Sequence, residues 1–549
     1  MKNKFNIFLL FLLLGILPAN SKQMPSQTRK IVIVRIDVNG TQTPISPYIY
    51  GTDDNIFLIS PYVPKISKPT FVRSGGDEWT PYNWENNATN SGFWFGPNSN
   101  YGIDAGFTRN SDSDKPGDAA LKRISAAHKF SAPALITVPI TDYVAADKND
   151  IVTEVASDSS TRWVQNKETK PTALSMDPDT SDKVVYQDEF VNFLQETFKD
   201  SLAQGKKIFY SLGNEPGIWN EVHALLHPEK TTYAEMADKT ERFGKMIKRI
   251  APDSLVFGCV AYGFNEFVSL QDAPDRLERD YLDFYLDTAK NLEAQEGKRI
   301  IDVLDIHWYT EARAEGKGII DTGSGSQTSH PSKAEIETRV QAPRSLWDPT
   351  YIEDSWITKD YYDKPTPIQL IPWLKEKIAA HYPGTKLAIT EYNYGDGIHI
   401  SHAVAQADVL GIFGREGLFA ANFLPLIDTP LTKGYLTGAF EMYLDYNGKG
   451  SMVGDLSLPV QNSDVVRTSV YAIKSSTDPN VLHIIAINKT NIEVTANINL
   501  IGGGFKTANA YQLTASKITP QAVGPVRLEG DKLIERLPRL SITTIEVRK

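Results

Sequence analysis

The chain has 549 residues, of which 41% are hydrophobic and 23% charged, an ordinary globular composition with room for one large domain and a smaller one. Its formal net charge is −10 and it contains no run of lysine or arginine, which disfavours nucleic acid and other polyanions as partners. Cys259 is the only cysteine and lies in an apolar run, so intramolecular disulfides and cysteine-based metal clusters are excluded and a buried thiol is expected.

The N-terminal residues have the pattern of a secretory signal peptide. Lys2 and Lys4 precede an apolar run over residues 5–17, and the small-residue segment 18–21 follows it. A membrane anchor is the alternative, but the run is shorter than the ~20 residues that a spanning helix needs. The sequence therefore predicts a signal peptide over residues 1–21, a mature chain without an integral membrane span, and export to the periplasm or the medium.

The middle of the chain alternates short apolar runs with segments of helical period. Apolar runs of this length are typical of buried parallel strands. They cover residues 48–51, 70–73, 134–138, 207–212, 255–261, 301–309, 386–391 and 418–426. Eight such strands separated by helices predict an α/β fold, a (β/α)8 barrel over residues 46–428.

Three of the helices between these strands are clearly marked. One carries apolar residues at four-residue spacing, namely Phe190, Leu194, Phe198 and Leu202. A second opens with the capping-box pattern Thr232-x-x-Glu235. A third opens with Thr366-Pro367 and runs to Tyr382, because a proline in the first turn after a capping residue favours a helix start.

The C-terminal residues change to the short strands of an antiparallel β domain. Residues 491–500 alternate strictly, and further strands are expected over 469–473, 481–487 and 540–547, divided by turn residues. The N-terminal run 31–38 has the same character, so strands before and after the barrel are expected to pair. The predicted second domain is a β-sandwich built from residues 29–45 and 429–549.

Two glutamates stand at the ends of predicted barrel strands, where the loops of such a barrel build an active site. Glu215 follows strand 207–212 within Gly213-Asn214-Glu215-Pro216, and Glu391 follows the apolar residues 387–390. The structural alternatives are a turn that feeds a helix for Glu215 and a helix-capping charge for Glu391. Two carboxyl groups across one barrel mouth are what glycoside cleavage requires, one to protonate the leaving oxygen and one to face the anomeric carbon.

Polar neighbours of these glutamates are candidate binding or positioning residues. Asn214 can hydrogen-bond a sugar 2-hydroxyl, and Arg73 can keep a catalytic carboxylate ionised. His307 and Tyr309 point the same way along the sixth predicted strand, and either can orient Glu391. A structural salt bridge is the alternative for Arg73, and satisfied core positions are the alternative for His307 and Tyr309.

Aromatic residues complete the predicted substrate-binding set. Trp84 and Trp219 offer flat apolar faces to sugar rings, and Tyr392 directly follows Glu391. Other aromatic residues crowd the same loop as Trp84, namely Trp79, Tyr82, Phe93, Trp94 and Phe95. A small core within the loop is the alternative for these side chains, and we expect some of each.

Seven segments spread over nearly all of the mature chain carry a family resemblance. They are 82–87 (YNWENN), 210–216 (YSLGNEP), 305–309 (DIHWY), 341–351 (QAPRSLWDPTY), 389–395 (ITEYNYG), 406–414 (QADVLGIFG) and 446–451 (YNGKGS). In these segments the chain resembles glycoside hydrolase family 44. The resemblance implies a (β/α)8 barrel with an appended β-sandwich, and retaining endo-cleavage of β-1,4-glucans such as cellulose derivatives and xyloglucan.

The resemblance also implies acid/base and nucleophile roles for Glu215 and Glu391, with no required cofactor. Some family members hold structural calcium, and its ligands are not assigned to residues of this chain. Three positions depart from the family pattern. Gly213 stands where an aspartate is expected, Asp77-Glu78 where Asn-Arg is usual, and Phe423-Leu424 where a tryptophan is expected. We expect all three to lie near the cleft and to alter substrate preference without changing the reaction type.

Two other functions agree with parts of the sequence. A metal-dependent barrel hydrolase would use Asp305, His307 and Glu391, but the chain has no His-x-His after the first predicted strand and no His-Glu-x-x-His. A non-catalytic carbohydrate-binding barrel is the second, although both glutamates are retained. The predicted partner is a β-glucan polysaccharide.

Overall fold

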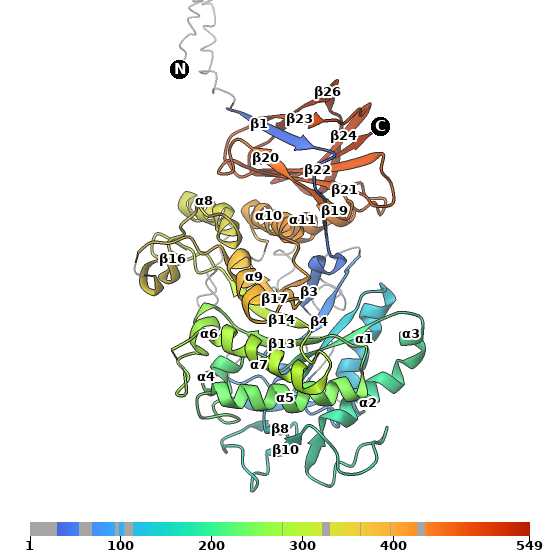
Figure 1. Cartoon of the computed structure of the whole chain (residues 1–549), viewed down its shortest axis with the longest axis vertical. Helices are drawn as coiled ribbons and strands as arrows, with labels where there is room; N and C mark the ends of the chain where they lie inside the picture. The colour runs from blue at the N-terminus through green and yellow to red at the C-terminus, as the bar shows by residue number, and fades with distance from the viewer. Residues whose placement is uncertain are drawn as a thin grey trace, which may run out of the picture.

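The computed structural model describes residues 30–53, 68–93, 98–103, 113–276, 278–320, 330–362, 364–395, 397–424 and 434–549. The predicted signal peptide lies outside these residues, as do Trp94 and Phe95. Within the described ranges, no helix is both long enough and apolar enough to cross a bilayer. The molecule has a body of helices and strands at one end and a layered β domain at the other (Figure 1).

Eight parallel strands close into a barrel inside the first of these bodies. In chain order they are β3 (Gly51–Asp53), β4 (Val72–Ser74), β7 (Ala134–Val138), β12 (Ile208–Leu212), β13 (Val256–Ala261), β14 (Val303–Tyr309), β17 (Lys386–Asn393) and β18 (Ala420–Phe423). Each strand pairs with the next, and β18 pairs with β3 to close the ring. Side chains fill the inside and helices cover the outside, which explains why the sequence runs are apolar throughout. The predicted (β/α)8 barrel is confirmed.

The first barrel strand begins later than the sequence predicted. Residues Pro47–Tyr50 form a 3-10 helix, because Pro47 lies in its first turn and Ser46 Oγ accepts a hydrogen bond from Tyr48 N–H. Strand β3 therefore starts only at Gly51.

The helices around the barrel are α1 (Asp118–Lys129), α2 (Gln187–Thr197), α3 (Lys199–Ala203), α5 (Tyr233–Ile250), α7 (Tyr281–Glu296), α9 (Leu370–His381) and α10 (Ile400–Glu416). The single helix predicted through Phe198 is two helices, because Phe198 leaves the helical conformation between α2 and α3. α5 starts where predicted, with Thr232 Oγ1 accepting from Glu235 N–H. The Glu235 carboxylate binds His227 and does not complete the capping box.

Helix α9 starts at Leu370 and not at Pro367 as predicted. The Thr366 hydroxyl donates to Lys364 O at 2.8 Å and does not cap a helix. The residue before α9, Gln369, has left-handed backbone torsions (φ 47, ψ 49), which set the chain direction for the helix.

Two three-stranded sheets are built from the loops that follow the second and third barrel strands. One contains β5 (Ala88–Asn90), β6 (Ser99–Gly102) and β9 (Asp150–Ile151), and the other contains β8 (Tyr143–Ala145), β10 (Trp163–Lys167) and β11 (Val184–Tyr186). Strands β8 and β10 lie at the end of the molecule remote from the β domain (Figure 1).

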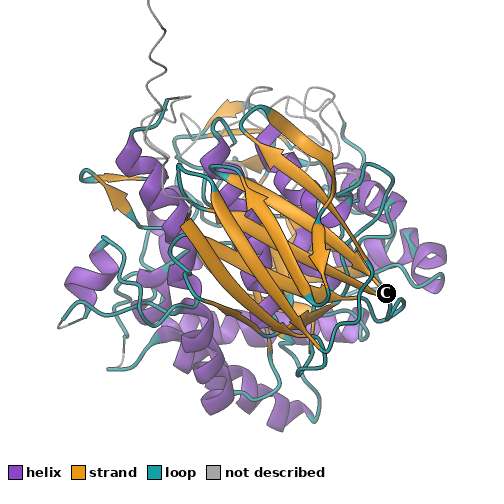
Figure 2. Cartoon of the chain, turned by 90° about the horizontal axis from the view of Figure 1, so that it is seen from above, coloured by secondary structure: helices purple, strands orange, loops and turns teal. Residues whose placement is uncertain are grey.

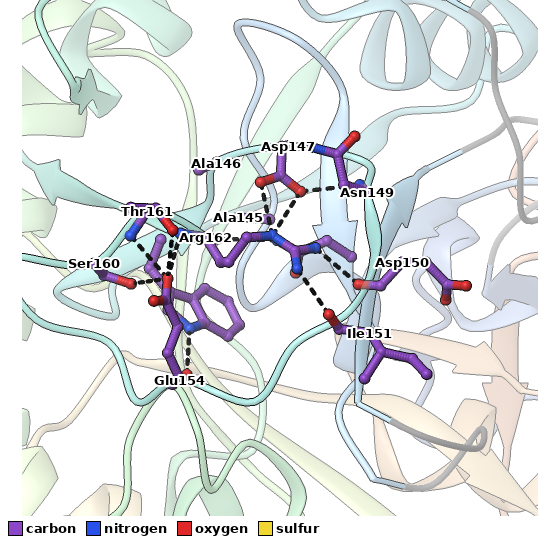
Figure 3. A network of polar contacts seen from close by, with 12 residues as sticks. Ala145, Ala146, Asp147, Asn149, Asp150, Ile151, Glu154, Ser160, Thr161 and Arg162 are labelled. Carbon is purple, nitrogen blue, oxygen red and sulfur yellow. Dashed lines mark hydrogen bonds and ion pairs between the residues drawn. The ribbon is translucent and has the colours of Figure 1, made fainter.

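A polar network around Arg162 holds the loop between β8 and β10 (Figure 3). The guanidinium donates to the Asp147 carboxylate and to the carbonyl oxygens of Asp150 and Ile151. Glu154 in turn accepts from the Arg162 backbone N–H and from Ser160 Oγ. Charge-assisted bonds of this kind fix a long loop whose own apolar core is small.

The β domain consists of two sheets that share one apolar core. The five-stranded sheet has the order β20 (Val460–Asn462), β1 (Lys30–Asp37), β23 (Val494–Ile501), β27 (Lys532–Leu537) and β26 (Arg527–Glu529). The seven-stranded sheet has the order β2 (Thr43–Pro44), β19 (Leu456–Leu458), β21 (Thr468–Lys474), β22 (Val481–Asn488), β28 (Ser541–Arg548), β24 (Thr507–Thr514) and β25 (Lys517–Pro525). As expected, N- and C-terminal strands pair, since β1 runs parallel to β23.

The outer face of the seven-stranded sheet packs on α10 and on α11 (Gly434–Leu444), which lies in a segment predicted to belong to the sandwich. Figure 2 shows the strands of the β domain lying across the helices below them. A buried ion pair joins the two bodies: Lys489 Nζ is 3.6 Å from Asp408 Oδ2 on α10. Tyr471 Oη donates to Asp408 Oδ1 at 2.5 Å, so two side chains of the β domain bind one carboxylate of the barrel.

Candidate active site

Glu215 stands on a tight turn beyond the end of β12. It has left-handed backbone torsions (φ 46, ψ 55), and the 3-10 turn Pro216–Ile218 follows it. Glu215 N–H donates to Val260 O at 3.0 Å, and Trp219 Nε1 donates to Asn214 O at 2.7 Å. The turn is thereby fixed, and the Glu215 side chain remains 14% exposed.

Glu391 lies inside the seventh barrel strand and not at its end as predicted, because β17 continues to Asn393. The strand register pairs Glu391 with His307 on β14. Glu391 is only 4% exposed. A carboxylate at such a position stays charged only if it is ion-paired and hydrogen-bonded.

Each oxygen of Glu391 has its own donor. Arg73 Nη1 donates to Oε1 and Tyr309 Oη donates to Oε2, both at 2.6 Å. Arg73 is fully buried, and it also binds Asp53 at the end of β3 and Asn214 Oδ1, the latter at 2.7 Å. One guanidinium therefore ties Glu391 to the segment that carries Glu215.

The ring of His307 lies between the two glutamates. Its Nδ1 is 2.7 Å from Glu215 Oε1 and 3.5 Å from Glu391 Oε2, so its closer partner is Glu215 and not Glu391 as predicted. One atom from each of the three side chains lies within 4.8 Å of the other two. The two carboxyl groups and the imidazole therefore form one compact cluster.

Burial and neighbouring charges separate the two glutamates electrostatically. Burial and the charge of Glu391 raise the pKa of Glu215 well above its usual value. Burial opposes ionisation of Glu391 too, but His307, Arg73 and the bond from Tyr309 outweigh it and lower the pKa of Glu391. Burial lowers the pKa of His307 to about 4, so the imidazole is neutral near pH 7. We therefore infer that the permanent charge of Arg73 keeps Glu391 ionised. One proton on Glu215 beside an ionised Glu391 suits acid-assisted bond cleavage.

The described residues contain one group of potential metal ligands close enough together to hold one ion. It consists of Glu215, His307 and Glu391. Their surroundings do not fit a cation. Both oxygens of Glu391 already accept hydrogen bonds. Arg73 Nη1, which carries positive charge, lies 2.6 Å from Glu391 Oε1 and would repel a cation. Calcium moreover prefers an all-oxygen shell, which a set containing an imidazole does not provide.

Three aromatic residues predicted to bind substrate are packed in the interior. Trp84 is 0% exposed, and its ring lies against Phe190 and Phe193 of α2. Trp219 is 1% exposed and supports the turn before it. Tyr392 is 0% exposed because it faces the opposite side of β17 from Glu391. The expectation that these side chains contact substrate is therefore corrected.

The remaining aromatic residues of the loop after β4 divide between core and surface. Trp79 and Tyr82 are fully buried, with ring centroids 4.8 Å apart, and they belong to the main apolar core, where Tyr82 packs against Phe190 of α2. Phe93 is 73% exposed, so its ring does not belong to that core. Cys259 is fully buried, as predicted.

The family departures do not all lie near the cleft. Asp77 does, because its Oδ1 accepts from Asn214 Nδ2 at 3.5 Å. Gly213 directly follows β12 with φ 70, and a Cβ there would meet Ile140 Cγ1 at 2.9 Å, so this backbone favours glycine. Phe423 is 0% exposed and packs against Tyr392, which corrects the expectation for Phe423, whereas the next residue, Leu424, is half-buried.

Sequence reasoning placed Asp77 near the cleft only as a departure from the family pattern, and it missed Asp53, a second acidic residue of the site. Asp53 ends β3, and its strand was predicted too early, so its position at a strand end was hidden. Asp77 follows Gly76, whose φ of 94 redirects the chain into the mouth of the barrel. A carboxylate at a strand end or within three residues of it is the signal that points to both.

Comparisons with known proteins agree with this geometry. Residues 73–312 match the profile of glycoside hydrolase family 44. The chain is 36% identical over 521 residues to endoglucanase A of Paenibacillus lautus, covering 93% of this chain and 71% of that protein. It is 36% identical over 488 residues to a β-mannanase/endoglucanase A of Caldicellulosiruptor saccharolyticus, covering 85% of this chain and 35% of the larger protein.

Solved structures give the same result. A family 44 xyloglucanase of Paenibacillus polymyxa, solved with xyloglucan, has a TM-score of 0.86 at 33% identity, covering 95% of this chain and 100% of that one. A family 44 endoglucanase of Clostridium thermocellum has a TM-score of 0.86 at 35% identity, with 94% and 100% covered. The chain therefore belongs to glycoside hydrolase family 44 and is a glycoside hydrolase.

Proposed function

We propose that this protein is a secreted retaining endo-β-1,4-glucanase that cleaves xyloglucan or cellulose-type chains by double displacement. One observation carries the proposal: a proton-bearing Glu215 and an ionised Glu391 face each other, with atoms of both side chains and of His307 within 4.8 Å. The relatives named endoglucanase and xyloglucanase support a β-glucan as the substrate. Glycoside hydrolases of this kind generally need no cofactor.

In the first step, Glu391 attacks the anomeric carbon while Glu215 protonates the departing glycosidic oxygen. Arg73 and Tyr309 hold both Glu391 oxygens in place, so the nucleophile does not rotate away from the sugar. Arg73 fixes the amide oxygen of Asn214, and one Nδ2 hydrogen of Asn214 is directed at Asp77 Oδ1. The second Nδ2 hydrogen is left to donate to the sugar 2-hydroxyl.

In the second step, the ionised Glu215 takes a proton from water, which attacks the covalent glycosyl-Glu391 intermediate. Loss of the negative charge of Glu391 in the intermediate removes the repulsion that raises the pKa of Glu215. The same residue can therefore act first as acid and then as base, and the configuration at the anomeric carbon is retained.

We also propose that the chain divides into a signal peptide (1–21), a barrel (46–428) and a β-sandwich (29–45 with 429–549). Helix α11 lies within the last range and joins the two folded parts. Export would bring the enzyme to polymeric substrates outside the cell. N-terminal sequencing of the exported protein tests the cleavage point, because a first residue well beyond 21–22 would contradict it.

The reaction is tested with a polysaccharide panel and two variants. We expect hydrolysis of xyloglucan or carboxymethyl cellulose, with oligosaccharide products of retained configuration in proton NMR. Glu391→Ala should abolish hydrolysis, and wild-type activity in that variant would refute the assignment. Glu215→Ala should keep its reaction with activated aryl glycosides and form a β-glycosyl azide when azide replaces the water that Glu215 would activate. A non-catalytic barrel would hydrolyse no member of the panel.

A further inference from the structure

A second buried glutamate lies behind the turn that carries Glu215, on a neighbouring barrel loop. Glu266 belongs to the short helix α6 (Phe264–Ser269), which follows β13. It is 0% exposed, and no step of the double displacement uses it. Burial raises the pKa of Glu266 to about 8, although two backbone hydrogen bonds oppose that rise. Burying a carboxyl group costs free energy unless hydrogen bonds compensate, so we ask which groups Glu266 binds.

The two oxygens of Glu266 bind the backbone of two different loops. Oε1 accepts from Gly217 N–H at 3.0 Å, and Gly217 is the second residue after Glu215. Oε2 accepts from Tyr262 N–H at 2.7 Å, in the segment directly after β13. One side chain therefore connects the turn after the fourth strand to the loop after the fifth.

The packing around this contact is tight. A Cβ added to Gly217 would lie 2.9 Å from Glu266 Cδ, so the loop is closed against the carboxyl group. The turn needs such support because Glu215 has a left-handed backbone (φ 46), a conformation that residues with a side chain rarely adopt. On its other side, Thr231 Oγ1 donates to Pro216 O at 2.6 Å.

We propose that Glu266 is a positioning residue that holds the proton-donating Glu215 in register with the leaving oxygen. The proposal rests on the acid/base role proposed above for Glu215. Arg73 and Tyr309 hold the nucleophile, and the described contacts of Glu266 include neither of them. The link between the two glutamates runs through Arg73 and Asn214 and not through Glu266. Disturbing Glu266 should therefore impair proton transfer and leave attack by Glu391 nearly intact.

Aryl β-cellotriosides separate these two effects, because a good leaving group departs without protonation. The measurement is kcat/KM for a phenyl and for a 2,4-dinitrophenyl substrate, with the full chain. In Glu266→Gln one oxygen acceptor becomes an N–H donor facing a backbone N–H. We expect kcat/KM to fall about 10- to 100-fold with the phenyl substrate and less than about 3-fold with the dinitrophenyl substrate.

A second variant disturbs the same contact from the opposite side. Gly217→Ala inserts a methyl group against Glu266 Cδ, and it should give the same dependence on the leaving group. The matched control is Glu353→Gln, which alters a carboxyl group of similar burial that binds Ser345 Oγ on another loop. It should change both rates equally, and its thermal midpoint shows the cost of losing any buried carboxylate.

The outcomes are distinct. Equal losses on both substrates, or no loss in either variant, would overturn the positioning role of Glu266. Glu215→Ala is the reference for the underlying assignment and should show the steepest leaving-group dependence of all. If Glu215→Ala has the same leaving-group dependence as the wild type, the acid/base role fails irrespective of the result with Glu266.

Discussion

Replacement of Tyr309 by phenylalanine removes one interaction and changes little else. The Tyr309 hydroxyl donates to Glu391 Oε2 at 2.6 Å, while Arg73 continues to hold the other oxygen. The bond from Tyr309 is one of the causes that lower the pKa of Glu391, so its loss raises that pKa. Glu391 must be ionised to attack, and hence the acid limb of the rate profile moves to higher pH.

The size of the shift follows from the strength of the bond. A hydrogen bond to a charged group contributes about 1.5–3 kcal/mol. One pH unit corresponds to about 1.36 kcal/mol, so the acid limb should rise by roughly one to two units. The basic limb reports Glu215, whose pKa is set by burial, Glu391 and Arg73, and this limb should stay in place. The profile therefore narrows from its acid side only.

The assay is kcat/KM for xyloglucan or carboxymethyl cellulose between about pH 3 and pH 10, because kcat/KM reports ionisations of the free enzyme. Tyr392→Phe is the matched control, since its equally buried hydroxyl accepts from Gln406 Nε2 and faces away from Glu391. That variant should lose stability and keep both limbs. An unmoved acid limb in Tyr309→Phe, or a shift of the same size in Tyr392→Phe, would refute the reasoning.

Three further predictions follow from burial and charge. Lys489→Met leaves Asp408 buried without its cation, and urea titration should show a loss of about 3–5 kcal/mol in the free energy of unfolding. The kcat should not change. An unchanged urea midpoint would contradict the role of this ion pair at the junction. Trp84→Phe should lower stability by about 1–3 kcal/mol and leave KM unaltered, whereas a raised KM would return Trp84 to the substrate site. EDTA should not reduce activity, and a loss that zinc restores would revive the metal-dependent alternative.

Both glutamates could be predicted because of how a parallel barrel is built. Its central strands are apolar on both faces, so residues such as 208–212 and 387–390 stand out in the sequence. A carboxylate directly beyond such a run lies at the barrel mouth. The same logic failed where local chemistry intervened, as at Ser46 and Pro47, whose 3-10 turn took the place of the predicted first strand.

Aromatic residues show the limit of sequence reasoning most clearly. Trp84 and Phe93 lie in the same loop, yet one is fully buried and the other is 73% exposed. Their position along the chain carries no sign of this difference, because it depends on α2, which packs over Trp84 from a distant part of the sequence. The same holds for Tyr392. Side chains alternate along β17, so Tyr392 faces away from the barrel interior because Glu391 faces into it.

The sequence by itself determined the barrel, the pairing of terminal strands, the family and the two glutamates, because apolar periodicity and strand-end position are local properties. Only the tertiary structure decided which partner each glutamate has. Arg73, His307 and Glu266 reach the site from the second, sixth and fifth strands or the loops that follow them, and sequence separation says nothing of the distances between their atoms. Those contacts set which glutamate keeps its proton, since burial and neighbouring charge, and not residue type, separate the two pKa values.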